Sequence, residues 1–194
     1  MPNKNGRLRV EKVALELFAD KGVASTSTRE IARAAGLAEG TLYRHYATKD
    51  DLAVALFLDA AGQLLTCMEA AVAKSPASKT QVKLLVATFF EFADRNPSAW
   101  QYLMHRHPPL RALPQDTRLP SALVVEVVRR GIEDGAFAVR DPVLGAAFVI
   151  GMTIRSVFFL KEGLLKGPAR TVSREVAGAA LRALEIKNED REET

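Results

Sequence analysis

The chain has 194 residues, with 27 lysines and arginines against 23 aspartates and glutamates, a formal net charge of +4. Its length is sufficient for a sizeable core, in one medium domain or two small ones. The single cysteine, Cys67, excludes a disulfide framework and favours a reducing compartment. No basic segment followed by an apolar run and a cleavage site is found, so we expect no signal peptide and a cytoplasmic protein.

Apolar residues recur at helical spacing along the chain, and no segment alternates in the way of a half-buried strand. Glycines, prolines and capping residues separate the periodic segments. The sequence therefore predicts an all-α fold of about nine helices. They are expected over residues 8–20, 28–35, 39–46, 50–74, 79–95, 98–105, 121–134, 142–161 and 173–186.

Residues 26–52 predict a helix-turn-helix of the DNA-binding type. Gly36 separates two apolar runs, at a bend that requires a residue tolerant of positive φ. Ala32, four residues before it, is small enough for two short helices to cross closely. Leu42, six residues after it, is expected to pack the second helix onto the first.

Capping boxes flank this motif. The first, from Ser27 to Glu30, is expected to start a helix near Thr28, and the second, from Thr48 to Asp51, starts the helix after the motif. Between them the recognition helix, over 39–46, is too short to be stable alone and depends on packing against its neighbours.

With these elements in register, TSTREIARAAG followed by GTLYRHYATKDDL resembles the N-terminal domain of the tetracycline-repressor (TetR) family, over about the first 55 residues. The remaining residues match the family only in length and helical character. The resemblance implies a DNA-binding domain over 1–50 and a helical effector-binding and dimerisation domain over 51–187. The acidic tail, 188–194, is expected to be disordered.

The first 49 residues carry nine basic and five acidic side chains, an excess that equals the net charge of the whole chain. This distribution favours contact with DNA phosphates. The basic residues Lys4, Arg7 and Arg9 form either a flexible arm or a solvated tail.

The expected DNA contacts centre on the recognition helix. Arg44 suits a guanine edge, because its planar guanidinium donates two parallel hydrogen bonds. Gly40 allows close approach, whereas Glu39 either contacts a base or matches the helix dipole. Thr41 and Tyr43 are expected on the exposed side, opposite Leu42, although Tyr43 could instead be partly core. The remaining contacts are expected from Ser27, Thr28, Arg29, His45 and Lys49, and the resemblance implies that Lys49 clamps a phosphate.

The segment 142–161 is apolar almost all round. A membrane span would place Arg155 deep in the hydrocarbon, so we favour a helix covered by its own domain and by a second subunit. Small residues on the last helix support a two-fold interface of four helices, with intrachain packing as the alternative. The expected interface residues are Ala147, Gly151, Ile154, Phe158, Ala177, Ala180, Leu181 and Leu184.

Aromatic residues and methionines gather in the second half of the chain. They either fill the core or line a mostly apolar effector pocket, which the resemblance favours. Arg155, expected to be buried, would need a carboxylate of the protein or of an acidic ligand. The candidate effector-binding residues are Phe89, Phe92, Trp100, Tyr102, Met104, His105, Phe148, Met152, Arg155 and Phe159.

We therefore expect a homodimeric regulator that binds an inverted-repeat operator in double-stranded DNA, without cofactor or metal, and that a small, mostly apolar effector releases. Repression is the simplest action, with activation as the alternative. A metal-dependent enzyme using Cys67, His105 and His107 lacks a defensible ligand spacing, and no phosphate-binding glycine loop or nucleophile elbow is present. A purely structural helical protein would leave the polar side chains of the motif unexplained.

Overall fold

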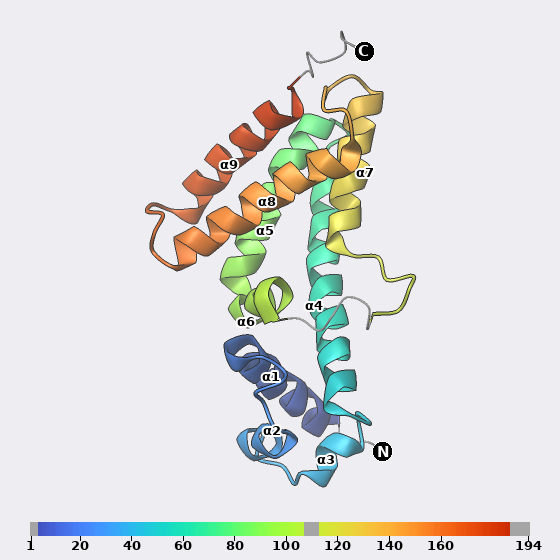
Figure 1. Ribbon diagram of the computed structural model, residues 1–194, viewed down its shortest axis with the longest axis vertical. Helices are drawn as coiled ribbons and strands as arrows, with labels where there is room; N and C mark the ends of the chain where they lie inside the picture. The colour runs from blue at the N-terminus through green and yellow to red at the C-terminus, as the bar shows by residue number, and fades with distance from the viewer. Residues whose placement is uncertain (1–3, 107–112, 187–194) are drawn as a thin grey trace, which may run out of the picture. The chain divides into compact units, whose positions relative to one another are not determined.

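The structure is a computed structural model that describes residues 4–106 and 113–186, and within these ranges it is all-helical, as predicted (Figure 1). The expected disordered tail and His107 lie outside the described residues. The elements are α1 (Lys4–Lys21), α2 (Thr28–Ala34), α3 (Gly40–Tyr43), α4 (Lys49–Val72), α5 (Ser78–Arg95), α6 (Pro97–Gln101), the π-helical turn η1 (Tyr102–Arg106), α7 (Pro120–Glu133), α8 (Pro142–Lys161) and α9 (Ala169–Leu184).

Four expected helices differ in their bounds by several residues. The first starts at Lys4 rather than at Leu8, and the sixth ends at Gln101, where η1 follows. The recognition helix α3 is a single turn rather than the segment 39–46, because the amides of His45 and Tyr46 both bond to the Leu42 carbonyl and close the chain into a turn. The last helix starts at Ala169 rather than at Ser173, with Pro168 extended immediately before it.

The described residues form two compact units. Within the described residues, the first comprises 4–62, 96–106 and 113–117, and therefore α1 to α3, the first part of α4, α6 and η1. The second comprises 63–95 and 118–186, with the rest of α4, α5 and α7 to α9. The functional domains expected over 1–50 and 51–187 stay a prediction, since compactness does not test where DNA and effector bind.

The core of the first unit is built where α1 packs against α2, α3, α6 and η1. Phe18, Ile31 and Leu42 are fully buried there. Tyr102 of η1 is also buried, with its ring centroid 6.0 Å from that of Phe18 and its hydroxyl donating to the Ala53 carbonyl at 2.8 Å. Burial, with a smaller effect of Asp50, raises the pKa of Tyr102, so this hydroxyl stays a neutral donor inside the unit.

In the second unit, α5, α8 and α9 pack on one another and α7 packs on α5 and α8 (Figure 1). Gly145 permits the close approach of α8, because a Cβ there would lie 2.8 Å from Val128 and 2.9 Å from Leu184. Arg118 adds ion pairs to Glu69 of α4 and Glu126 of α7.

Two helices, α4 and α8, are long and apolar enough to cross a membrane by length and composition alone, with mean hydropathies of 1.4 and 2.0. This is weak evidence, because core helices of soluble proteins satisfy the same test. Only 28% of the apolar window of α8 is buried within the chain. Its exposed apolar surface therefore needs another explanation.

Candidate DNA-binding surface

The bend of the helix-turn-helix has the predicted geometry. Gly36 has a φ of +64°, and the amide of Leu37 bonds to the carbonyl of Ala32 at 2.9 Å. A Cβ at Gly36 would also lie 2.8 Å from the guanidinium of Arg9. Ala32 and Leu42 are buried, as expected. The positive φ therefore favours glycine here, whereas the flexible end of the exposed Arg9 side chain could move aside for a Cβ.

Capping residues hold the ends of the motif. Ser27 Oγ accepts from the amide of Glu30 at 3.1 Å and starts α2. The Lys21 ammonium, 2.5 Å from the Glu30 carboxylate, lowers the pKa of that carboxyl group. At the start of α4, Thr48 and Asp51 exchange two hydrogen bonds of 3.0 Å between side chain and backbone, a complete capping box.

Tyr46 connects the turn after α3 to α1. Its hydroxyl donates to the carboxylate of Glu11, and the guanidinium of Arg7 lies 5.7 Å from its ring centroid. Burial, together with the hydrogen bond to Glu11, raises the pKa of Tyr46 to about 12. The sequence motif did not reveal Glu11 as an anchor, because it lies 35 residues before Tyr46.

Four polar side chains meet on one surface of α2 and α3, which we call the α2–α3 face: Thr28, Arg29, Glu39 and Tyr43. The Thr28 hydroxyl donates to Glu39 Oε1 at 3.2 Å and lies 3.3 Å from the hydroxyl of Tyr43. Arg29 Nε donates to Glu39 Oε2 at 3.5 Å, and 87% of the Arg29 side chain is exposed. The expected DNA contacts from the two helices thus lie side by side, with Glu39 between them.

Tyr43 is exposed, which favours the DNA-facing interpretation over the core alternative. Thr41, by contrast, is buried, so the expectation that it lies on the exposed side is wrong. In the single turn of α3 its hydroxyl faces inward and accepts from Arg44 Nη2 at 3.1 Å. Arg44 itself is exposed, and a Cβ at Gly40 would meet nothing within 4 Å, so the surface at the start of α3 is open.

Lys49 lies at the start of α4, where its ammonium donates to the Thr26 carbonyl at 2.8 Å. This bond uses one of three ammonium hydrogens and leaves two for a phosphate. His45 is half-buried in the turn after α3, and Ser27 is exposed at its capping position. Contact of these three residues with DNA stays a prediction.

The predicted effector residues do not gather in one unit. Trp100, Tyr102 and Met104 belong to the first unit, and the side chain of His105 lies outside the described part. The others lie in the second unit: Phe89, Phe92, Phe148, Met152, Arg155 and Phe159. Phe89, Phe92, Trp100 and Tyr102 are buried, and Met104, Phe148 and Met152 are half-buried.

Arg155 corrects a further expectation, because it is exposed rather than buried. Its guanidinium lies 5.4 Å from the ring centroid of Phe158 and 5.6 Å from that of Phe159. Cation–π contact on the helix surface therefore replaces the carboxylate partner that a buried arginine would need. Nothing in its position requires an acidic ligand.

The expected interface residues divide between the two helices. On α9, Ala177, Ala180 and Leu184 are buried within their own unit, against α5 and α8, so the expectation that they contact a second subunit is wrong. Leu181 is half-buried.

On α8, Ala147 and Gly151 are exposed and Ile154 and Phe158 are half-exposed. Val143, Leu144 and Phe159 extend this surface, with 61%, 37% and 41% of each residue exposed. We call these seven residues the α8 outer face. Four of them, Ala147, Gly151, Ile154 and Phe158, belong to the expected interface, whose place between two subunits stays a prediction.

Comparison with known proteins agrees with this geometry. Residues 12–56 match the family described as bacterial regulatory proteins, tetR family. A tetR-family regulatory protein from Rhodococcus RHA1 is 23% identical, with a TM-score of 0.78 over 96% of this chain and 100% of the other. A TetR-family transcription regulator from Marinobacter aquaeolei VT8 is 21% identical, with a TM-score of 0.79 over 94% and 96%.

The transcriptional regulator FadR from Bacillus subtilis, solved in complex with stearoyl-CoA, is 20% identical, with a TM-score of 0.76 over 90% and 97%. These TM-scores demonstrate a shared fold along nearly the whole chain, whereas the family match covers the helix-turn-helix and its flanking helices. Residues 12–56 thus match the N-terminal domain of bacterial regulatory proteins of the tetR family, and the chain as a whole shares the fold of these solved structures.

Proposed function

We propose that this protein is a homodimeric, cytoplasmic regulator that occupies an inverted-repeat operator and represses transcription until a small-molecule effector releases it. The observation that carries the proposal is the α2–α3 face. It presents the exposed side chains of Tyr43 and Arg29, and the same helix-turn-helix adds the exposed Arg44 and the unobstructed start of α3.

In the bound state, Arg44 would donate to a guanine and Tyr43 and Thr28 would contact phosphate or base edges. In the free protein Arg29 donates a hydrogen bond to Glu39, so this bond must break before Arg29 can contact DNA. Lys49 would contribute a phosphate contact while its bond to Thr26 keeps the start of α4 next to α2.

The α8 outer face supports the dimer. In a monomer, Val143, Leu144 and Phe159 stay exposed to water, and the free energy of burying this apolar stripe is not gained. A two-fold copy would cover the stripe and would place two recognition helices at a fixed separation. Because operator half-sites are spaced by multiples of the DNA repeat, binding by both helices at once depends on that separation.

The effector is proposed to be small and mostly apolar. Support for an apolar part of the effector comes from the aromatic side chains of the second half and from the apolar acyl chain of the stearoyl-CoA bound by FadR of Bacillus subtilis, although its coenzyme A moiety is large and charged. Effector binding would change the orientation of α4, and release requires a difference in affinity between the two states of roughly 1–3 kcal/mol or more. An activator would use the same DNA surface at a differently placed operator.

A selection of random duplex DNA with the purified protein tests the proposal. We expect an inverted repeat whose half-site centres lie a whole number of helical turns apart, and specific binding at least about 1000-fold tighter than binding to unrelated duplex. A protein that enriches no sequence, or enriches only a single half-site, would contradict the dimeric regulator.

A further inference from the structure

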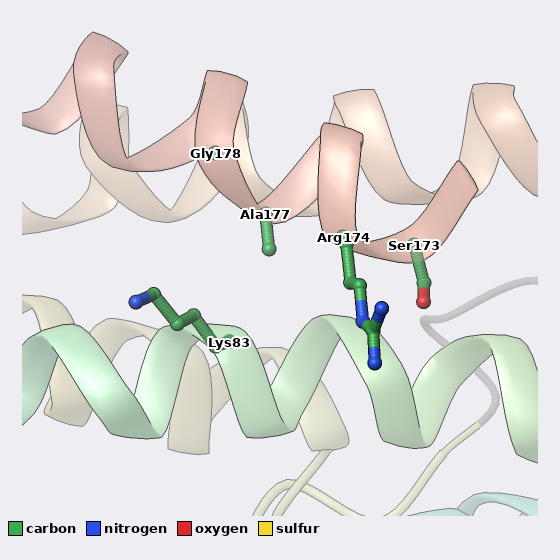
Figure 2. A pocket seen from close by; sticks show the side chains of 5 residues that line it. All are labelled: Lys83, Ser173, Arg174, Ala177 and Gly178. Atoms are coloured by element: carbon green, nitrogen blue, oxygen red, sulfur yellow. The ribbon is translucent and has the colours of Figure 1, made fainter. Parts of the chain in front are cut away.

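A groove in the second unit lies between α5 and α9 and has a volume of about 340 Å³. Lys83 lines it from α5, and Ser173, Arg174, Ala177 and Gly178 line it from α9 (Figure 2). This volume lies within the range of small-molecule sites, roughly 300–1,000 Å³. The groove contains no residue predicted to bind DNA, effector or a second subunit except Ala177.

Charge in the groove is positive and uncompensated. Lys83 and Arg174 are both exposed, and neither forms an ion pair with any residue that the structure describes. Lys79, one turn earlier on α5, does form an ion pair, because its ammonium lies 2.5 Å from the carboxylate of Glu185 at the end of α9. The same two helices thus pair one lysine with a carboxylate and leave the next one without an ion pair among the described residues, with Arg174 toward the other end of the groove (Figure 2).

The wall between the two cations is apolar. Figure 2 shows the methyl group of Ala177 pointing toward α5, with Gly178 beside it and the Arg174 side chain reaching from α9 toward α5. Ser173 adds no free donor, because its hydroxyl donates to the carbonyl of Arg170 at 3.0 Å. Gly178 leaves the wall open beside Ala177, and a Cβ there would meet only the Arg182 guanidinium, at 3.5 Å.

We propose that this groove binds a small organic carboxylate with a compact apolar body. The planar guanidinium of Arg174 suits the two oxygens of a carboxylate, and Lys83 adds a second positive charge. The apolar body would lie against Ala177 and Gly178. The site is separate from the DNA-binding surface, so the inference does not depend on the proposed function.

Titration calorimetry with 2-naphthoate as the probe, and with its uncharged amide for comparison, tests the proposal. Wild-type protein should bind the carboxylate at least about tenfold more tightly than the amide, which is the effect of one charge-assisted hydrogen bond of about 1.5–3 kcal/mol. Arg174→Gln should weaken binding by about tenfold or more, and Lys83→Gln by a smaller factor. Lys79→Gln, which removes a paired charge one turn away, should leave the affinity unchanged.

Gly178→Leu provides a test independent of charge. Leucine occupies a helix more favourably than glycine, so the protein should stay folded while the side chain fills the groove and abolishes binding. In two-dimensional NMR, the backbone amides of Ala177 and Gly178 should shift on titration. The proposal is overturned if wild-type protein does not bind 2-naphthoate, if the amide binds equally well, or if Arg174→Gln and Gly178→Leu both retain the wild-type affinity.

Discussion

Two surfaces of this chain are suited to contact another macromolecule, and their chemistry is opposite. The α2–α3 face is polar, with its side chains bonded to one another through Glu39. The α8 outer face is apolar, and the guanidinium of Arg155 on the same helix lies over Phe158 and Phe159. Water solvates the polar face at little cost, whereas the apolar face gains free energy when it is covered. The first is therefore suited to reversible binding, and the second to a lasting subunit contact.

The largest effect, on stability, is expected on α9, where the stripe of small residues is already packed inside the second unit. Ala180 of α9 is fully buried within the second unit. Ala180→Glu should destabilise the protein by about 3–5 kcal/mol, because it places an unpaired charge in the core. Thermal unfolding followed by circular dichroism measures this change. A variant that melts like the wild type would mean that α9 is less closely packed than the structure shows.

The same substitution on the α8 outer face should act on assembly alone. Ala147→Glu places two like charges near the two-fold axis and should weaken dimerisation by about 100-fold or more, with the melting of the monomer unchanged. Sedimentation velocity measures the dimer, with Thr80→Glu, at an exposed position of α5, as the control. If Ala147→Glu remained a dimer at micromolar concentration, the α8 outer face would not be the interface.

Next to the α2–α3 face in the sequence, Arg44 is expected to read one base pair of each half-site. Arg44→Ala should relax the base preference at that position, at a cost of roughly 1–3 kcal/mol, because the bidentate contact is lost. Repeating the DNA selection with the variant measures the preference. An unchanged consensus sequence would exclude Arg44 from base recognition.

Lys49→Ala should weaken binding to every duplex to a similar extent and reduce the slope of log affinity against log salt by about 0.9, the effect of one phosphate contact. Lys74→Ala, an exposed lysine of the second unit, is the matched control. A lower melting temperature with an unchanged salt slope would assign Lys49 to its bond with Thr26 alone.

The smallest effect is expected from Glu39→Gln. The substitution removes the charge that holds Arg29 while it keeps an acceptor for Thr28. Affinity for unrelated duplex DNA should rise about two- to fivefold, in line with the modest strength of an exposed ion pair. Fluorescence anisotropy with a labelled duplex measures this. A loss of affinity at one operator position would instead mean that Glu39 contacts a base.

How far these features were predictable depends on the range of the interactions that determine them. Gly36, Leu42 and the two capping boxes act within a few residues, so the sequence predicted both the motif and its ends. The inward orientation of Thr41 was not predictable, because it depends on α3 ending after one turn.

In the second unit, an apolar helix face does not indicate by itself what covers it. Ala180 and Ala147 both lie in stretches of small residues, yet one is buried by α5 and α8 and the other is exposed. The groove beside Gly178 could not be predicted either, since it depends on Lys83, distant in sequence, lying opposite α9.

Cys67, the single cysteine of the sequence, is exposed on α4 in the second unit. One maleimide or nitroxide probe therefore attaches to each protomer without any engineering of the chain. In the proposed symmetric dimer, the distance between the two probes has one value for each conformational state. Pulsed electron paramagnetic resonance can then count the states with and without DNA, so the populations that the proposed regulation requires become directly measurable in the wild-type sequence.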